Sequence, residues 1–91
     1  MTETPKLGDT LYYLQYVCTG NFATAYYIVR PALYAATYAG PPVEMWLRFD
    51  SRSAVWVRES KLGSQVFTDE AEAQQAADRW TKRLRESWRS L

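Results

Sequence analysis

Two tryptophans and two arginines in the middle of the chain have types and spacing that suit binding rather than catalysis. Residues 43–50 and 54–59 each alternate apolar and polar side chains with the period of two that is typical of a β-strand. The less apolar face carries Trp46, Arg48, Trp56 and Arg58. Indole and guanidinium groups often anchor protein–protein contacts, and they also stack on the bases of single-stranded nucleic acid.

The seven tyrosines form a second candidate group, and all of them lie between Tyr12 and Tyr38. Tyrosine is a good strand former whose hydroxyl can remain hydrated, so the group can be the core and rim of a sheet. It can equally be a recognition face, because tyrosine buries a large area at a small entropic cost. We include Tyr13 and Tyr26 in the expected contact set.

A third candidate group lies near the C-terminus and consists of Arg79, Lys82, Arg83 and Arg89. Residues 78–91 carry a charge of +3, whereas residues 63–77 carry −3. Cations near a helix C-terminus complement the helix dipole, which is a structural role. The same side chains could contact phosphates, although the acids at the helix start would repel a nucleic-acid backbone running along its whole length.

The composition argues against catalysis. The chain has no histidine, which excludes histidine-dependent nucleophile pairs and nearly all zinc sites. Its one cysteine, Cys18, has no disulfide partner within the chain and is predicted to be a small buried residue. Glycine-rich phosphate loops and nucleophile elbows are absent from the sequence. We therefore expect no enzyme, no metal and no cofactor.

The length of 91 residues predicts a single domain over residues 1–91. A net charge of +1 gives no general argument for nucleic acid or a membrane as partner. The first ten residues lack an apolar signal segment, and no stretch reaches 18 apolar residues, so we expect a cytoplasmic protein. Residues 1–9 are predicted to be a flexible N-terminus, residues 10–67 mainly β-structure and residues 69–90 a helix.

Residues 10–18 and 22–30 predict a first β-hairpin with a two-residue turn at Gly20-Asn21. This turn would place Leu14 opposite Tyr27. One face carries Tyr12, Leu14, Tyr16, Ala25, Tyr27 and Val29, and the other carries Leu11, Tyr13, Gln15, Val17, Phe22, Tyr26 and Ile28. Neither face is clearly polar, so the hairpin is either covered on both sides or keeps one face for a partner.

Residues 31–39 predict a short helix, because Pro31 suits a first helical position and Gly40-Pro41 ends the segment. An extended excursion is the alternative. Residues 43–50 and 54–59 then predict a second hairpin, with Met45 and Leu47 on its apolar face. The predicted register pairs Arg48 with Trp56 and Trp46 with Arg58, as cation–π contacts of about 0.5–1 kcal/mol each.

Residues 65–67 predict a short edge strand that leads into a helix capped by Thr68 or Asp69. The helix carries one apolar stripe, formed by Ala73, Ala77, Trp80, Leu84, Trp88 and Leu91. The predicted fold is therefore α+β: an antiparallel sheet of four to five strands, arranged as two hairpins, packed by one long C-terminal amphipathic helix. A partly rolled, SH3-like sheet is the main alternative.

Two segments resemble small proteins encoded by phages and prophages: GDTLYY at residues 8–13 and VFTDEAEAQQAA at residues 66–77. Proteins of this type include inhibitors of bacterial defence systems, anti-CRISPR proteins among them, and host-takeover factors. The resemblance implies a non-catalytic protein that binds and blocks a larger complex, and it assigns no residue a role. The near-neutral charge departs from inhibitors that mimic DNA.

These observations lead to three hypotheses. The first is a protein-binding module that acts by steric occlusion through Tyr13, Tyr26, Trp46, Arg48, Trp56 and Arg58. The second is a nucleic-acid-binding domain that uses the Trp/Arg group and the basic helix end. The third is a homodimer in which the tyrosine face pairs with itself.

Overall fold

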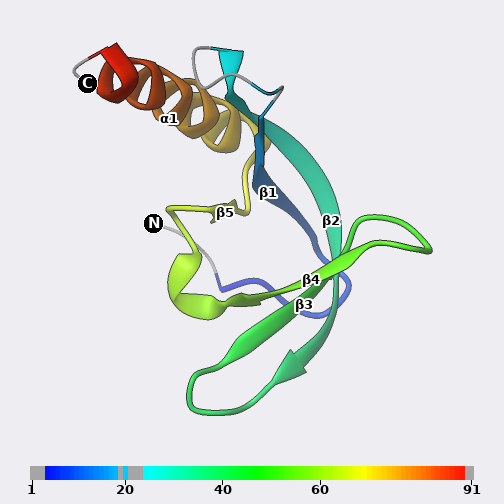
Figure 1. Ribbon diagram of the computed structural model, residues 1–91. Helices are drawn as coiled ribbons and strands as arrows, with labels where there is room; N and C mark the ends of the chain where they lie inside the picture. Colours follow the sequence, from blue (N-terminus) through cyan, green and yellow to red (C-terminus); the bar gives the residue numbers. More distant parts are fainter. Residues whose placement is uncertain (1–3, 19, 21–23, 90–91) are drawn as a thin grey trace.

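The computed structural model describes residues 4–18, 20 and 24–89, and it places side chains up to residue 87. Its elements are β1 (Thr10–Val17), β2 (Tyr26–Tyr38), β3 (Glu44–Arg48), β4 (Ala54–Arg58), the 3-10 helix η2 (Glu59–Lys61), β5 (Val66–Phe67) and α1 (Glu70–Arg89). The strands form one antiparallel sheet in the order β4-β3-β2-β1-β5 (Figure 1). The predicted α+β fold, with one long C-terminal helix packed on an antiparallel sheet, is confirmed.

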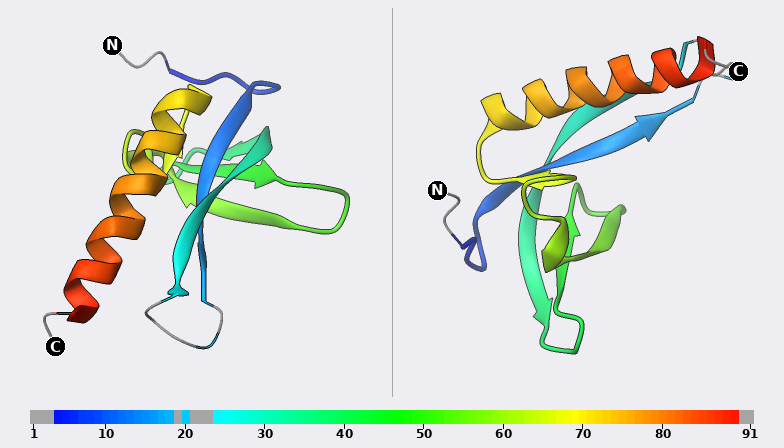
Figure 2. Two further views of the ribbon diagram at one scale, coloured as in Figure 1. Left: turned by 90° about the horizontal axis from the view of Figure 1, so that it is seen from above. Right: turned by 90° about the vertical axis from the view of Figure 1, so that its left-hand side faces the viewer.

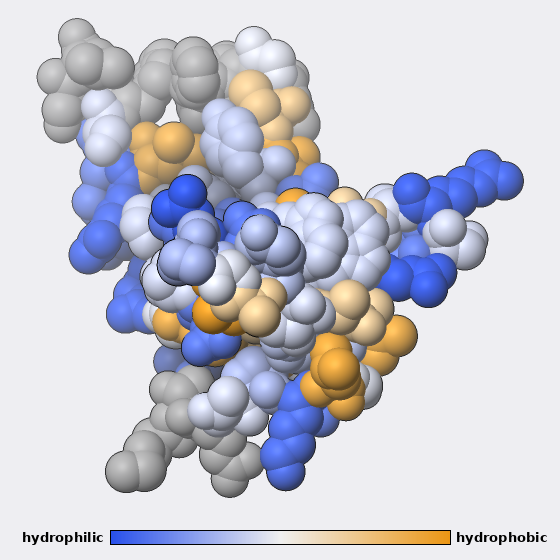
Figure 3. Space-filling model, turned by 90° about the horizontal axis from the view of Figure 1, so that it is seen from below, coloured by the Kyte–Doolittle hydropathy of each residue, from blue (hydrophilic) through white to orange (hydrophobic). Residues whose placement is uncertain are grey.

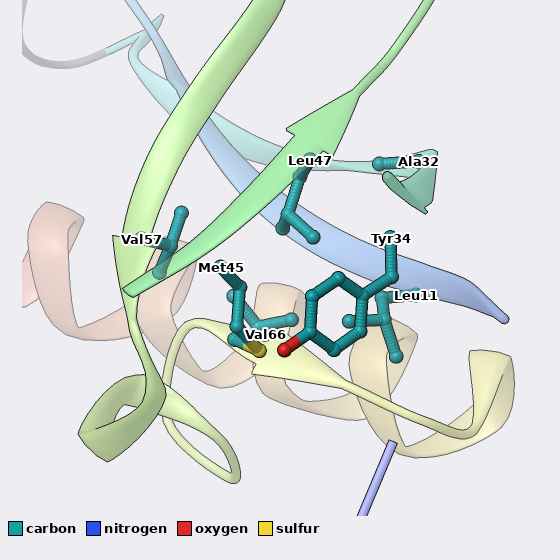
Figure 4. Close-up of a cluster of buried hydrophobic side chains, with 7 residues drawn as sticks. All are labelled: Leu11, Ala32, Tyr34, Met45, Leu47, Val57 and Val66. Atoms are coloured by element: carbon teal, nitrogen blue, oxygen red, sulfur yellow. The ribbon is translucent and has the colours of Figure 1, made fainter. Parts of the chain in front are cut away.

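The sheet is partly rolled, because its two edge strands contribute to the same core. Val57 on β4 and Val66 on β5 lie at opposite edges of the sheet, yet both belong to one cluster of buried side chains. The other members of this inner cluster are Leu11, Ala32, Tyr34, Met45 and Leu47 (Figure 4). Neighbouring strands lie about 4.8 Å apart, so a flat five-stranded sheet would hold its edges too far apart for such contact. The fold therefore combines the predicted helix layer with the rolled sheet of the alternative.

Helix α1 covers the other face of the sheet, over the β1–β2 hairpin (Figure 2). Ala73, Ala76 and Ala77 are buried there in a second cluster with Leu14 and Phe67. Alanine side chains let the helix backbone lie close to the strands, and close packing of this kind leaves little room for larger groups. The helix thus covers the face of the first hairpin that carries Leu14.

The predicted apolar stripe of α1 is fully buried only in the first half of the helix, and its later member Leu84 is half-buried. Ala73 and Ala77 are fully buried, as predicted, but Trp80 keeps 40% of its surface exposed. The later turns of the helix diverge from the hairpin when the molecule is seen from above (Figure 2). Trp88 and Leu91 lie outside the residues whose side chains the structure describes. The helix start agrees with the prediction, since Oδ2 of Asp69 accepts a hydrogen bond from the backbone N–H of Glu72 at 3.1 Å.

Residues 31–39 were predicted to form a short helix, and this prediction is wrong because β2 continues through Tyr38. Pro31 lies inside the strand without costing a hydrogen bond. Successive strand residues direct their N–H groups to opposite neighbours, and Tyr34 donates to Asp9 on the β1 side. Position 31 therefore faces the β3 side, where pairing starts only at Leu33, so a residue without an N–H group is tolerated.

The register of the first hairpin differs by two residues from the predicted one. Leu14 lies opposite Val29 rather than Tyr27. The predicted turn at Gly20-Asn21 falls in the connection between β1 and β2, where Asn21 lies outside the described residues. A shift by an even number of residues preserves side-chain alternation, so the two faces of the hairpin are divided as predicted.

Within the predicted N-terminal segment 1–9, residues 6–9 form a hydrogen-bonded turn, and residues 1–3 lie outside the described residues. The N–H of Gly8 donates to the carbonyl of Tyr34 at 2.9 Å, and the N–H of Lys6 donates to Oδ2 of Asp9 at 2.8 Å. Cys18 is exposed, so the prediction that it is buried is wrong. The cause is that β1 ends at Val17, one residue before the cysteine.

Candidate functional site

Three rows of register partners cross β2, β3 and β4 on the face opposite the inner cluster. The rows are Leu33–Arg48–Ala54, Ala36–Trp46–Trp56 and Tyr38–Glu44–Arg58. Register partners place their side chains on the same face, so the nine residues form one surface. We call its large members the outer aromatic surface: Leu33, Tyr38, Trp46, Arg48, Trp56 and Arg58. The row that contains both tryptophans lies between two rows that each contain one arginine, and we call these the arginine rows.

The two tryptophans of this surface contact each other. Their ring centroids lie 4.8 Å apart, with an interplanar angle of 42°. The predicted cation–π pairs, Arg48 with Trp56 and Trp46 with Arg58, are wrong, because the hairpin register differs by two residues from the predicted one. Arg48 lies opposite Ala54, and Arg58 lies opposite Glu44.

The loop between β3 and β4 sets this register. The N–H of Phe49 donates to the carbonyl of Ser53 at 2.9 Å, which closes the hairpin around three residues. Inside the loop, Oδ1 of Asp50 accepts hydrogen bonds from the N–H groups of Arg52 and Ser53, both at 2.7 Å. An aspartate that caps its own turn in this way favours the observed loop length over the alternatives.

The carboxyl group of Asp50 is expected to titrate below its ordinary value. The backbone N–H of Arg52, then that of Ser53, stabilise the carboxylate and lower the pKa of Asp50. Because the folded-state pKa is the lower one, the carboxylate stabilises the hairpin above its unfolded-state pKa, and this contribution is lost as the pH falls through the folded-state value. A carbon-13 NMR titration measures this pKa directly. A midpoint at or above the ordinary aspartate value would contradict the loop geometry.

The outer aromatic surface is open to solvent. Trp56 is 48% exposed, Leu33 is 45% exposed and Tyr38 is 58% exposed. Leu33 and the helix-packed Val29 share one face of β2 by alternation, so this surface belongs to the sheet face on which α1 packs. The helix contacts that face mainly over β1, β2 and β5. Seen from below, the molecule shows pale and orange side chains in its middle, with hydrophilic ones among them and at the margins (Figure 3). Apolar and aromatic groups therefore remain exposed where the helix does not reach.

The structure separates Tyr13 and Tyr26 from the other four expected contact residues. Tyr13 packs beside the inner cluster, with its ring 5.4 Å from that of Phe49, and its hydroxyl accepts a hydrogen bond from Gln65 Nε2 at 3.1 Å. Tyr26 lies on the same face of the first hairpin and is 36% exposed. This face is opposite to the one that carries Trp46 and Trp56, so one flat contact cannot use all six residues.

The tyrosine group divides between core and surface. Tyr34 is buried, and its hydroxyl lies 2.6 Å from Thr37 Oγ1. The half-buried tyrosines are Tyr12, Tyr13 and Tyr27, and the exposed ones are Tyr16, Tyr26 and Tyr38. The group is therefore neither a pure core nor a single recognition face.

The basic residues of α1 lie in two different places. Arg79 and Arg83 line a hollow that also contains Trp80, whereas Lys82 lines another hollow together with Asp78 and Glu86. The side chain of Arg89 lies outside those that the structure describes. Of the four residues expected to contact nucleic acid, the structure therefore brings together Arg79 and Arg83 and places Lys82 in a different hollow.

Sequence reasoning missed Leu33 and Tyr38 as members of the exposed surface. An irregularity in the pairing of β2 with β3 lies between Tyr34 and Ala36, and it breaks the alternation of the strand. The interrupted pattern, together with several alanines, favoured a helix over a strand. The β-branched residue Thr37 and the four tyrosines between residues 26 and 38 were the signals in favour of a strand.

Among the residues that the structure describes, no group of three histidine, cysteine or carboxylate side chains is arranged to hold a metal ion. Within the same part of the chain, no helix combines the length and the apolar character needed to cross a membrane. Comparison with family models, curated proteins and solved structures found no match to this chain.

Proposed function

We propose that the protein is a non-catalytic binding module whose outer aromatic surface docks on a protein partner. The observation that carries this proposal is the contacting pair Trp46 and Trp56, which stands on an uncovered sheet face between two arginine rows. Exposed large apolar groups that lie together are uncommon on proteins that act alone, and tryptophan and arginine are the commonest hot-spot residues.

The expected partner has an apolar pocket rimmed by acidic groups. Trp56 is the more exposed tryptophan and would enter the pocket, while Trp46 supports it from β3. Arg48 and Arg58 are both exposed, and they would reach carboxylates at the rim from opposite sides. The two strands hold these groups in place before binding, which lowers the entropic cost of association.

The resemblance to small phage and prophage proteins supports a more specific form of this proposal, in which the partner is a bacterial defence or host complex that the protein blocks by occlusion. In the structure, the resembling segment of residues 66–77 consists of β5 and the capped start of α1. In the strand order β5 is farthest from β4, so this segment does not belong to the outer aromatic surface.

Replacing Trp56 with alanine is expected to weaken partner binding by about 30-fold or more, because truncation of a central hot-spot tryptophan costs about 2 kcal/mol or more. The partner is first captured from nuclease-treated bacterial lysate with the tagged wild-type protein and identified by mass spectrometry. Calorimetry with the purified partner then gives the dissociation constants of the wild type and of the W46A and W56A variants.

The matched control is Tyr26→Ala, which removes an exposed aromatic ring from the opposite face of the sheet. It should bind the partner as the wild type does. Two results would overturn the assignment of this surface. One is a loss of binding in Tyr26→Ala as large as that in W56A, and the other is full binding by W46A and W56A. A concentration-dependent dimer that Trp56→Ala converts to a monomer would identify a second copy of the chain as the occupant.

A further inference from the structure

A cationic groove runs between α1 and the segment that connects η2 to the helix. It consists of two hollows of about 150 and 270 Å³, and Trp80 and Ser64 line both of them. Arg79 and Arg83 line the smaller hollow, and Lys61 lines the larger one. We call this feature the Trp80 groove. It lies where α1 packs near β1 and β5, whereas the outer aromatic surface is formed by residues of β2, β3 and β4.

The charge of the Trp80 groove is of one sign. Within the described residues, the side chains lining its two hollows include three cations and no carboxylate. The hollow on the other side of the helix is different, because Asp78 and Glu86 accompany its cations. Arg79 and Arg83 are four residues apart on the helix, and like charges at this spacing destabilise a helix unless an anion lies between them. The groove therefore favours an anionic ligand.

The groove also offers a surface for a planar ring. The indole of Trp80 is 40% exposed, and the ring centroid of Tyr27 lies 6.3 Å from it. Leu14 and Tyr27 line the larger hollow with apolar surface. Gln65 lines it as well, and its side-chain amide donates a hydrogen bond to the Tyr13 hydroxyl. The guanidinium of Arg83 lies over the Trp80 ring, 5.6 Å from its centroid, so a base would stack on the other face of the indole with this cation across the ring.

We propose that the Trp80 groove binds a nucleotide unit, either free or within a single-stranded nucleic acid. The base lies against Trp80 in the larger hollow, where Leu14 and Tyr27 provide apolar surface. The phosphate lies in the smaller hollow between Arg79 and Arg83. Stacking on an aromatic side chain combined with arginine contacts to phosphate is the general mode of recognition of unpaired nucleotides. This site is independent of the proposed protein-binding surface.

Binding is measured by fluorescence anisotropy with labelled single-stranded DNA and RNA of about ten nucleotides, and by calorimetry with AMP. Arg79→Gln and Arg83→Gln should each weaken binding by about tenfold or more, because each removes a charge-assisted hydrogen bond to phosphate. Trp80→Leu should weaken it by about 5- to 100-fold through lost stacking. Each arginine variant should also reduce the salt slope of oligonucleotide binding by about 0.7.

The matched control is Arg85→Gln, the same substitution on the same helix, at a residue that lines the mixed-charge hollow. It should change the affinity by less than about twofold, since it loses only a distant charge. Because Arg79 and Arg83 are exposed, their variants should fold even if Trp80→Leu does not, and circular dichroism checks this. W56A should retain nucleotide binding, which separates this site from the protein-binding surface.

Binding of AMP identifies a free nucleotide as a sufficient ligand, whereas binding of the oligonucleotides alone identifies a single strand. Either outcome, with the variant pattern above, supports the proposal. Three results would overturn it: no binding of any probe at millimolar concentration, equal loss in Arg85→Gln and Arg83→Gln, or equal affinity for a polyglutamate peptide. The last result would assign the groove to acidic peptides.

Discussion

Ala77→Asp is expected to lower the free energy of unfolding by about 3–5 kcal/mol, the range found when an unpaired charge is left buried. Ala77 is fully buried in the cluster where α1 meets Leu14 and Phe67. Among the described residues no polar or charged side chain is buried, so the new carboxyl group would be surrounded mainly by apolar groups. Urea denaturation followed by circular dichroism at about pH 7 measures the loss.

The same variant gives a pH dependence of known sign. Burial disfavours the charged form, so the pKa of the introduced carboxyl is raised in the folded state. The destabilisation is then complete above the folded-state pKa and becomes smaller as the pH falls toward the unfolded-state value. The difference between variant and wild type should therefore be smaller at about pH 3.5 than at about pH 7.

Ala71→Asp is the matched control, since Ala71 is an exposed residue in the first turn of the same helix. A carboxylate in this position interacts favourably with the helix dipole, so the change should be within about 0.5 kcal/mol of zero or stabilising. A similar loss in both variants would mean that α1 does not pack on the sheet through its alanines.

Leu47→Ala is expected to cost about 2–5 kcal/mol, through lost burial and the cavity left in the inner cluster. Leu47 is fully buried on β3, and its neighbours in the cluster come from all five strands. A domain of this size has a total stability of about 5–14 kcal/mol, so the variant approaches the limit of folding. Chemical denaturation of both proteins gives the difference from their midpoints and slopes.

Leu33→Ala provides the comparison with the same chemical change at an exposed position. Leu33 lies on β2 beside Arg48, and 45% of its surface is exposed. Its truncation should cost about 0.5 kcal/mol. If Leu47→Ala were no more destabilising than Leu33→Ala, the rolled core formed by the two sheet edges would be contradicted.

The parts of the fold that depend on local order in the chain were predictable from the sequence. The alternation along β3 correctly predicted that Met45 and Leu47 are buried and that Trp46 lies on the other face. The cap at Asp69 and the burial of Ala73 follow from the same kind of short-range rule. The period of a strand or helix decides which way a side chain points, and the chain itself carries that period.

Registers were not predictable in the same way. Both hairpins are shifted by two residues from their predicted pairing, which keeps each face intact but changes each partner. Hydrogen bonds in the loops set the register, such as those that Asp50 accepts in the β3–β4 loop. The tryptophans therefore contact each other rather than the arginines, which alternation alone could not indicate.

The tertiary structure alone decided how distant segments meet. It placed Tyr13 and Tyr26 on the face opposite Trp56, and it brought Lys61 to the groove that Arg79 and Arg83 line. Side-chain direction is a property of neighbouring residues, so the sequence by itself determined which groups share a face on β1, β3 and β4, whereas the pairing irregularity of β2 broke this rule. Which side chains of distant segments lie together depends on the roll of the sheet and on the angle at which α1 crosses it. These depend on packing in the two cores, so the division into two candidate sites became visible only in the folded molecule.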